Sequence, residues 1–438
     1  MVAAAVAPWS AERVIGLAPD AASAKAGRGL ATAAKWADTG ASEDALWGHC
    51  QGSGKKPYQA CVELAEPAYR CTCPSRKFPC KHVLGLMLLW SAGAVAAAEE
   101  EPEWVGSWLE SRAGRAERAR QRAESAGPRD EKAAAKRADE RLTRVRSGAA
   151  ELREWLTDRL GAGLGGLRGG DELRTVAARM VDAQAPGLAS GLRRAAALAD
   201  ARRGAPQALL GELSMLFLLA DSVSRLDELP AELVETVRTR LGFPVDTARV
   251  LESGERVSDD WLVVGVSDEE NDGLVTRRAW LRGERSDRTA VVLAFAPPGR
   301  PLDGSLPTGH VVSAELAFHP GVPPLRASVV DRAEPVLAPE PRGVAVDGAL
   351  DGYARALAAD PWTDRVPVVL ARVVPTRHGE SWALSDEDGK QALPLVSTVD
   401  PWPLLALAAT GPVTVAAEWG ATGLHPLTCW HDGRVIRL

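Results

Sequence analysis

The sequence predicts an α+β protein of several domains: a small ββα unit, a helical middle region and an antiparallel β-rich C-terminal half. Three observations predict this class. Three cysteines and a histidine crowd together before residue 95, apolar residues recur with a helical period over residues 149–245, and β-branched residues alternate from residue 246 onward. At 438 residues the chain also exceeds the roughly 150 residues of an average domain.

The first segment, residues 1–95, is expected to hold a hairpin, the cysteine cluster and then a helix. In LWGHCQGSGKKPYQACVEL, alternating residues flank a Gly-containing stretch, which predicts two short strands joined by a turn. After the cluster, the apolar run KHVLGLMLLW predicts a helix with Val83, Leu86, Met87 and Trp90 on its buried face. The expected local order is therefore ββα.

The second segment, residues 96–148, is expected to be a charged helical or partly disordered linker. Between Arg112 and Arg146 there are 12 Arg or Lys and 6 Asp or Glu, with few large apolar residues. Trp104 and Trp108 would share a helix face just before this stretch and are expected to pack. The stretch is interpreted as a solvated helix, with a basic arm that binds phosphates as the alternative.

The third and fourth segments, residues 149–245 and 246–438, differ in their periodicity. The third is predicted to form a small helical bundle, because its leucines follow a helical period between proline and glycine breaks. In the fourth, runs such as WLVVGV, TAVVLAFA and PVVLARVV are separated by Gly, Pro and Asp turns. They predict one or two antiparallel β units, with a barrel as one arrangement. Periodicity does not specify the order of these strands.

The cysteine cluster has the composition of a zinc site. Its spacing is Cys-x-Cys-x6-Cys-x-His, formed by Cys71, Cys73, Cys80 and His82. One intervening residue puts the first two cysteines on the same face of an extended chain, and the last two ligands fall at the start of the predicted helix. Three thiolates and an imidazole are a complete tetrahedral set for Zn²⁺. We therefore expect one structural zinc ion and a zinc-stabilised ββα finger.

This cluster, with a hairpin before it and an apolar helix after it, resembles the SWIM zinc finger. That finger occurs in bacterial proteins, chromatin-remodelling ATPases and Mutator-type plant transposases. The matching residues are the four ligands, and the likeness covers about residues 25–92. The resemblance implies a module that binds DNA or proteins. The composition, rich in Ala, Arg, Gly and Leu, is also similar to that of high-GC actinobacterial proteins.

Basic residues surround the cluster and would allow contact with nucleic acid. They are Lys55, Lys56, Arg70, Arg76, Lys77 and Lys81. Only Glu63 and Glu66 oppose them nearby, so the region is locally basic although the formal net charge of the chain is −6. The same side chains could instead offset the negative charge of the thiolates or form an ordinary solvated surface. Nucleic-acid contact and a structural or protein-docking role both stay open.

The expected function is that of a non-enzymatic zinc-binding protein. Its finger would contact nucleic acid, with DNA favoured, and the other domains would contact protein partners. The alternative is a protein–protein adaptor in which the finger docks a partner or only holds the fold. No paired-carboxylate, serine-hydrolase or dinucleotide fingerprint occurs, so no catalytic residue or small-molecule substrate is identified. An unrecognised activity in residues 246–438 is the third alternative.

Localisation is expected to be cytoplasmic, without a membrane partner. Six cysteines are too few for a disulfide-rich secreted scaffold of this length. No run approaches the roughly 20 apolar residues of a membrane-spanning helix.

Overall fold

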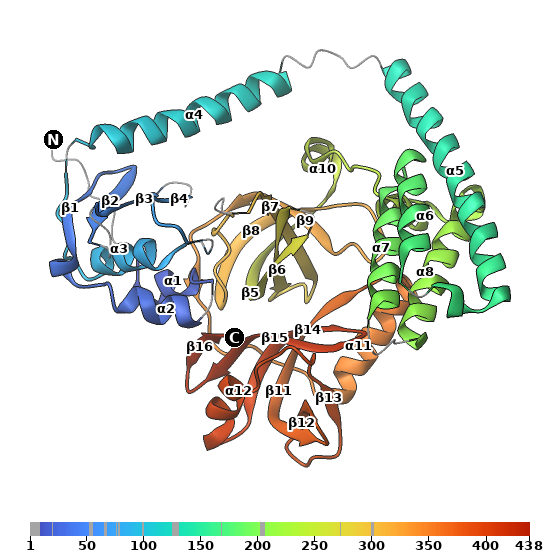
Figure 1. Ribbon diagram of the computed structural model, residues 1–438. Coiled ribbons are helices and arrows are strands. Elements are labelled where there is room, and N and C mark those ends of the chain that lie inside the picture. Colours follow the sequence, from blue (N-terminus) through green and yellow to red (C-terminus); the bar gives the residue numbers. More distant parts are fainter. Residues whose placement is uncertain are drawn as a thin grey trace.

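The computed structural model gives the fold of most of the chain. The described residues form a four-stranded sheet, two six-stranded sheets and a series of helices (Figure 1), which confirms the predicted α+β class. They are residues 9–19, 21–51, 56–64, 68–75, 77, 79–98, 100–124, 131–167, 169–201, 206–271, 273–298 and 302–438. Side chains are described throughout these ranges except at residues 21, 115–124, 131–135 and 271.

The N-terminal domain is built on a four-stranded antiparallel sheet. Its strands lie side by side in chain order: β1 (Trp36–Ala41), β2 (Ala45–Cys50), β3 (Tyr58–Glu63) and β4 (Ala68–Cys71). The predicted hairpin is β2 and β3, joined in register. The predicted ββα finger is therefore present, and β1 and β4 widen its sheet. Two short helices precede the sheet, α1 (Ala11–Gly16) and α2 (Ala21–Arg28).

Helices cover both faces of this sheet. On one face lies α3 (Lys81–Ser91), in which every residue from His82 to Trp90 is buried. On the other face, the start of α4 (Glu103–Glu124) places Val105 and the two predicted tryptophans of this segment against Trp47 and Cys61. Because both faces are covered, the zinc-ligand region belongs to a domain with its own apolar core.

Two long helices connect the finger domain to the helical bundle. α4 leads away from the finger, and α5 (Glu131–Ala162) enters the bundle on the other side of the molecule (Figure 1). From Glu103 onward, the described parts of the predicted charged linker are therefore helical. The predicted boundary after residue 148 falls inside α5, since Val145 and Leu152 belong to one buried stripe on that helix.

The bundle contains α5, α6 (Asp171–Asp182), α7 (Pro186–Asp200), α8 (Pro206–Ser224) and α9 (Ala231–Leu241) around a core of Leu, Val and Ala.

Within the described ranges, α8 alone has the length and composition to cross a membrane. It is weak evidence for a membrane span, since core helices of soluble proteins have the same properties. Leucines of α8 lie in the bundle core, and its two carboxylates pair with arginines of neighbouring helices. These contacts make α8 part of the bundle core. The short α10 (Thr247–Ser253) leads to the β-rich half.

The first β unit is a closed five-stranded barrel. Its strands are β5 (Glu255–Asn271), β6 (Leu274–Gly283), β7 (Thr289–Ala296), β8 (His310–Phe318) and β9 (Arg326–Arg332). The spatial order β8-β5-β6-β7 is that of a Greek key. β9 closes the barrel by pairing antiparallel with β8 and parallel with β7. The inward side chains form an apolar core, and the two-residue strand β10 (Val336–Leu337) extends the edge of β8.

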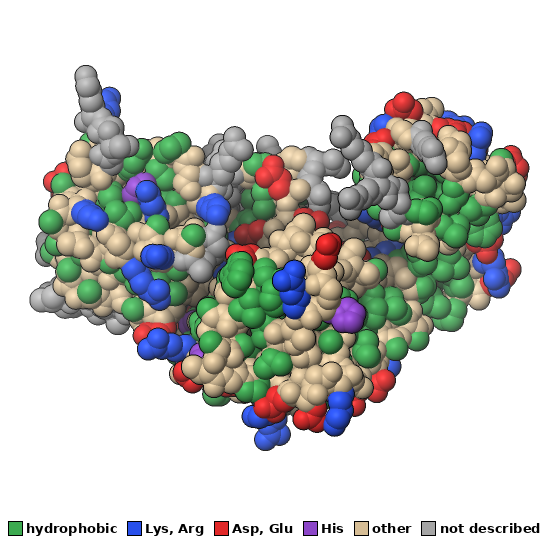
Figure 2. All heavy atoms as spheres, turned by 60° about the horizontal axis from the view of Figure 1, so that its bottom comes forward, with side chains coloured by type: hydrophobic (Ala, Val, Ile, Leu, Met, Phe, Trp, Pro, Cys, Tyr) green, Lys and Arg blue, Asp and Glu red, His purple; other side chains and the backbone are tan. Residues whose placement is uncertain are grey.

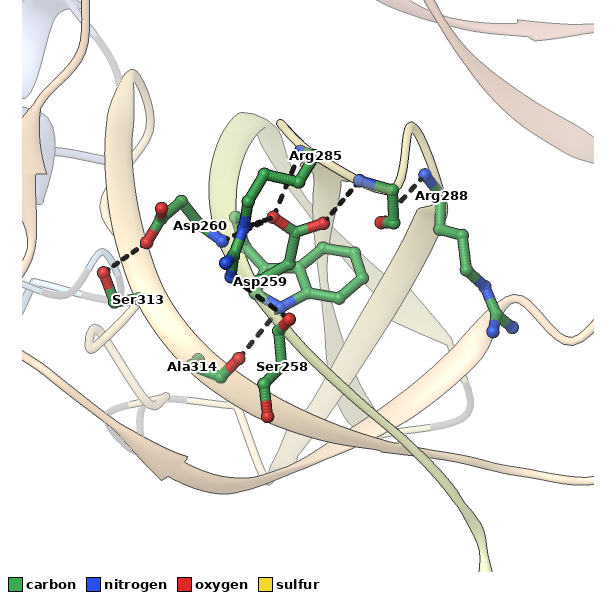
Figure 3. A network of polar contacts seen from close by, with 9 residues as sticks. Ser258, Asp259, Asp260, Arg285, Arg288, Ser313 and Ala314 are labelled. Carbon is green, nitrogen blue, oxygen red and sulfur yellow. Dashed lines mark hydrogen bonds and ion pairs between the residues drawn. The ribbon is translucent and has the colours of Figure 1, made fainter.

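A buried carboxylate fixes the turn between β6 and β7 (Figure 3). The Asp259 carboxylate on β5 accepts hydrogen bonds from the backbone N–H groups of Asp260, Arg285 and Ser286, at 2.7, 3.1 and 2.8 Å. The Arg285 guanidinium also donates to it at 3.2 Å. Burial alone would raise the pKa of Asp259, but these donors outweigh burial and lower it to about 2. The ionised side chain therefore holds the turn at neutral pH.

The second β unit is an antiparallel sheet packed against the barrel. Its order is β13 (Ala392–Pro394), β12 (Ser381–Asp386), β11 (Arg365–His378), β14 (Val413–Gly420), β15 (Gly423–His431) and β16 (Arg434–Arg437). Helices α11 (Val346–Ala359) and α12 (Trp402–Leu407) pack on one face. On the other face Leu427 and Trp430 pack against Trp280 of the barrel. Together the two units make the predicted β-rich C-terminal half.

The finger domain also contacts the β-rich half. The Arg437 guanidinium donates to the carbonyl of Ala18, at 2.8 Å, and to that of Val266 in β5, at 3.1 Å. Arg13 on α1 pairs with Glu334 at 2.5 Å. One surface of the finger is thus used within the chain.

Candidate metal centre

Four predicted ligands converge where β4 meets α3. Cys71 is the last residue of β4, and Cys73 follows two residues later. Cys80 is the N-cap of α3, with extended backbone at φ −74° and ψ 166°, and His82 lies in the first helical turn. The four ligand atoms all lie within 4.8 Å of one another. The structure therefore brings together every residue of the predicted metal set.

The separations fit one tetrahedral zinc ion. Nδ1 of His82 lies 3.8 Å from Sγ of Cys71 and 3.9 Å from Sγ of Cys80. Zinc bonded to sulfur at about 2.3 Å and to nitrogen at about 2.0 Å would hold such atoms about 3.6 Å apart. Nδ1, rather than Nε2, is thus the ligand nitrogen of His82. Since the protein fills all four positions, the site is of the structural kind.

The surrounding backbone favours thiolates. Hydrogen bonds from the Cys71 and Cys80 thiols lower the pKa of Cys73, and the backbone N–H of Ser75 lowers it further. A hydrogen bond with Cys71 and the N–H of Val83 also lower the pKa of Cys80 at the N-terminus of α3, but the neighbouring Cys73 and burial raise it overall to about 11. Zinc binds the thiolate form, so these donors assist metal binding.

The centre is continuous with the apolar core of the finger. Cys73, Cys80 and His82 are buried, and Cys71 is half-buried. The ring of Tyr58 on β3 packs against that of His82, with 4.8 Å between the ring centroids and 39° between the ring planes. Tyr58 lies within the predicted hairpin, but its sequence position did not connect it with the metal. Only the pairing of the sheet brings it to His82.

The predicted basic residues that the structure describes are all exposed. They are Lys56, Arg70, Lys77 and Lys81, whereas Lys55 and Arg76 lie outside the described residues. Of the two nearby acidic residues, Glu63 pairs with Arg112 on α4, and Glu66 lies outside the described residues. In Figure 2 the finger domain, at the left, carries scattered Lys and Arg side chains in a largely neutral surface.

Comparison with known families agrees with this geometry. Residues 61–90 match the model of the SWIM zinc finger. The chain carries a SWIM zinc finger. The match contains all four ligands and lies inside the predicted residues 25–92. No curated protein and no solved structure matches the chain.

A second match extends the SWIM assignment to the helical region. Residues 140–241 match the SWIM-associated four-helix bundle domain. The sequence predicted helices here, but nothing in their apolar period connected them with the SWIM finger. Elsewhere in the described parts of the chain, no further group of His, Cys, Asp or Glu has the spacing of a metal site.

Proposed function

We propose that this protein is a non-enzymatic, cytoplasmic nucleic-acid-binding protein, with DNA as the favoured ligand of its SWIM finger. The observation that carries the proposal is the exposed basic surface beside the zinc-ligand loop. Its described members are Lys56, Arg70, Lys77 and Lys81. Phosphate groups are the ligands that such a surface attracts without base-specific contacts.

The charge balance of the finger supports this role. Three thiolates, a neutral imidazole and Zn²⁺ sum to a charge of −1, whereas Lys56, Arg70 and Lys81 alone contribute +3. Glu63 is already neutralised by Arg112. Offsetting the thiolates therefore uses only part of the positive charge, and the surplus faces solvent. Excess positive charge on a zinc-stabilised domain attracts an anionic polymer such as DNA. This attraction weakens strongly as the salt concentration rises.

Exposed apolar side chains support additional contacts with protein partners. Trp402 at the start of α12 is 69% exposed, and Phe295 on β7 is 51% exposed. Large aromatic side chains are common at the centres of protein interfaces. In this proposal the finger contacts nucleic acid, and the remaining domains contact proteins.

The alternative proposal is a protein–protein adaptor. It is favoured by the docking of one finger surface against the β-rich half through Arg13 and Arg437. In that case the finger is a structural or docking module, and the complex with its protein partner is insensitive to nucleic acid. An activity within residues 246–438 is the third alternative.

A combined charge removal tests the first proposal. In the variant K56A/R70A/K77A/K81A we expect affinity for DNA to fall roughly tenfold or more at low salt, because several phosphate contacts are lost. Zinc content should be unchanged, since no ligand is altered. Fluorescence anisotropy with labelled DNA gives the affinity, and metal analysis gives the zinc content.

The control removes the same number of charges away from the finger. These are the exposed basic residues Arg193, Arg249, Arg355 and Lys390, replaced together by Ala. The control variant should bind DNA like the unaltered protein. Equal affinity of the finger variant and the unaltered protein would exclude the finger surface as the DNA contact and favour the adaptor.

A further inference from the structure

A cavity of about 220 Å³ lies where the barrel, the helical bundle and the second sheet meet. Trp280 of β6 and Val291 of β7 form its floor, and they are cross-strand neighbours on the outer face of the barrel. Arg326 of β9 pairs with Val291 and extends the same row. The wall opposite is the β8–β9 connection, whose Val322 N–H donates to Thr236 of α9 at 2.9 Å.

Five-stranded Greek-key barrels of the OB type take ligands on the face of their second and third strands. In this barrel those strands are β6 and β7. The cavity therefore lies on the face that such barrels use for binding. Fold alone does not define a site, so the assignment depends on the side chains.

Four arginines line the cavity, and three of them are neutralised. Arg240 pairs with Asp360 at 2.5 Å, Arg278 with Glu269 at 2.7 Å, and Arg365 with Glu269 and Glu418 at 3.0 Å each. Arg326 has no carboxylate within ion-pair distance among the described residues. Burial lowers the pKa of this half-buried guanidinium. A desolvated cation without a counter-charge is costly, and an anion in the cavity would offset that cost.

His319 supplies a second unpartnered group. Its side chain is buried, with 4% of the residue exposed, and Nδ1 has no hydrogen-bond partner. Nε2 lies 2.9 Å from Oγ of Ser328. Burial and the nearby Arg326 lower the pKa of His319 to about 4, so the ring is neutral at pH 7. When the Ser328 hydroxyl donates to Nε2, the ring proton is on Nδ1, which is then a donor.

We infer that this cavity binds a small oxoanion, a phosphate or a carboxylate carried on a compact apolar group, held by Arg326 and His319. One oxoanion satisfies both residues, because its oxygens accept from the guanidinium and from Nδ1–H. Leu293, Pro323 and Pro324 provide apolar walls for the rest of the ligand. The volume is below the roughly 300–1,000 Å³ of pockets for drug-sized ligands, which suits a small molecule or a terminal group.

Calorimetry on the full-length zinc-loaded protein tests the inference. The probes are inorganic phosphate alone and benzoate alone, each at constant ionic strength in a buffer without other oxoanions. We expect at least one of them to bind with one site per chain, and the probe that binds identifies the oxoanion. R326Q and H319L should each weaken that binding roughly tenfold or more, the value of one charge-assisted hydrogen bond.

R332Q is the matched control, since Arg332 lies on the same strand outside the cavity and should leave affinity unchanged. Zinc content and circular dichroism establish that each variant is folded. The inference is overturned if neither probe binds the unaltered protein, or if R326Q and H319L both bind as tightly as R332Q. None of the residues that line the cavity belongs to the finger domain, so this result can be read separately from the DNA-binding test.

Discussion

His82 and the three cysteine ligands show how single residues couple metal binding to the fold. His82 is both a ligand and the first of nine consecutive buried residues on α3. Removal of the ion would therefore release the start of this helix from the sheet and expose its apolar side chains. Structural zinc in small domains contributes about 10–16 kcal/mol. Most of the stability of the finger is therefore expected to depend on four side chains.

Replacing one ligand should unfold the finger alone. In C80A we expect loss of the single zinc ion and rapid hydrogen exchange over residues 21–91, with the bundle and barrel still protected, because those have separate cores. C61A is the control, since this buried thiol lies on the opposite face of the sheet, away from the cluster. Metal analysis gives the zinc content, and hydrogen exchange measured by mass spectrometry shows which residues lose protection. Full zinc retention in C80A would contradict the assigned site.

Asp259 makes a pH-dependent contribution at the same scale. Its pKa is about 2 in the folded chain and about 3.9 when unfolded, so ionisation stabilises the fold by roughly 2 kcal/mol at neutral pH. That contribution is complete above the unfolded pKa and is lost as pH falls through the folded pKa. D259N should therefore speed hydrogen exchange in the β6–β7 turn at pH 7.

The pH dependence of this exchange, corrected for the intrinsic chemical rate, separates the charge from other effects. The difference between D259N and the unaltered protein should shrink between about pH 4 and pH 2. D351N, at an exposed position, should show no difference at either pH. A difference that stays constant down to pH 2 would mean that the carboxylate charge is not what holds the turn.

At the scale of elements, α2 and α3 approach each other through glycines. A Cβ on Gly85 would lie 2.7 Å from Cβ of Leu30, and one on Gly27 would lie 2.7 Å from Cβ of Leu84. Such distances leave no room for a methyl group. Glycine at residue 85 thus allows α2 to pack closely against α3, the helix that covers one face of the finger sheet.

G85A should push α2 away from α3 and cost about 1–3 kcal/mol, as overpacking does. G106A on α4 is the control, because a Cβ there has open space and Ala favours a helix. The two variants are compared by thermal unfolding, which is monitored through the hydrogen exchange of residues 21–28 in the finger. Equal stability of G85A and G106A would show that the contact between these helices is loose.

Elements defined by local pattern could be predicted, and those defined by distant pairing could not. The four ligands fall within twelve residues, so spacing alone placed them, and the apolar run predicted the helix α3. Burial extends over all of His82–Trp90 and not only over the predicted face of Val83, Leu86, Met87 and Trp90, because the helix is enclosed on several sides. β1 was missed because WADTGA has low β propensity. Its Gly40 is explained only by the fold, since a Cβ there would lie 2.4 Å from the indole of Trp47 on β2.

At the scale of the whole molecule, closure of the barrel brings together residues from remote segments. β5 pairs with β8, with Trp261 opposite Val312, and the cavity combines Thr236 of the bundle with Arg326 and Arg365 of two different sheets. Strand runs in the sequence do not encode which strands meet. The sequence therefore predicted a β-rich half but not the residues of this cavity.

The finger and the SWIM-associated bundle lie on opposite sides of the β-rich half, joined by α4 and α5 (Figure 1). Arg437 ties the finger to β5 and so limits which finger surfaces a partner can reach. The described basic residues around the zinc-ligand loop, Lys56, Arg70, Lys77 and Lys81, remain exposed in this arrangement. The central claim is that these residues contact phosphates.

A salt titration tests that claim most directly. The binding of the zinc-loaded protein to single-stranded DNA, double-stranded DNA and RNA would be measured by anisotropy across a range of salt concentrations. We predict binding to DNA whose logarithmic affinity falls with the logarithm of salt with a slope of roughly −2 to −4, for a few phosphate contacts at about 0.9 each. No binding to any nucleic acid at low salt would contradict the claim and favour the adaptor.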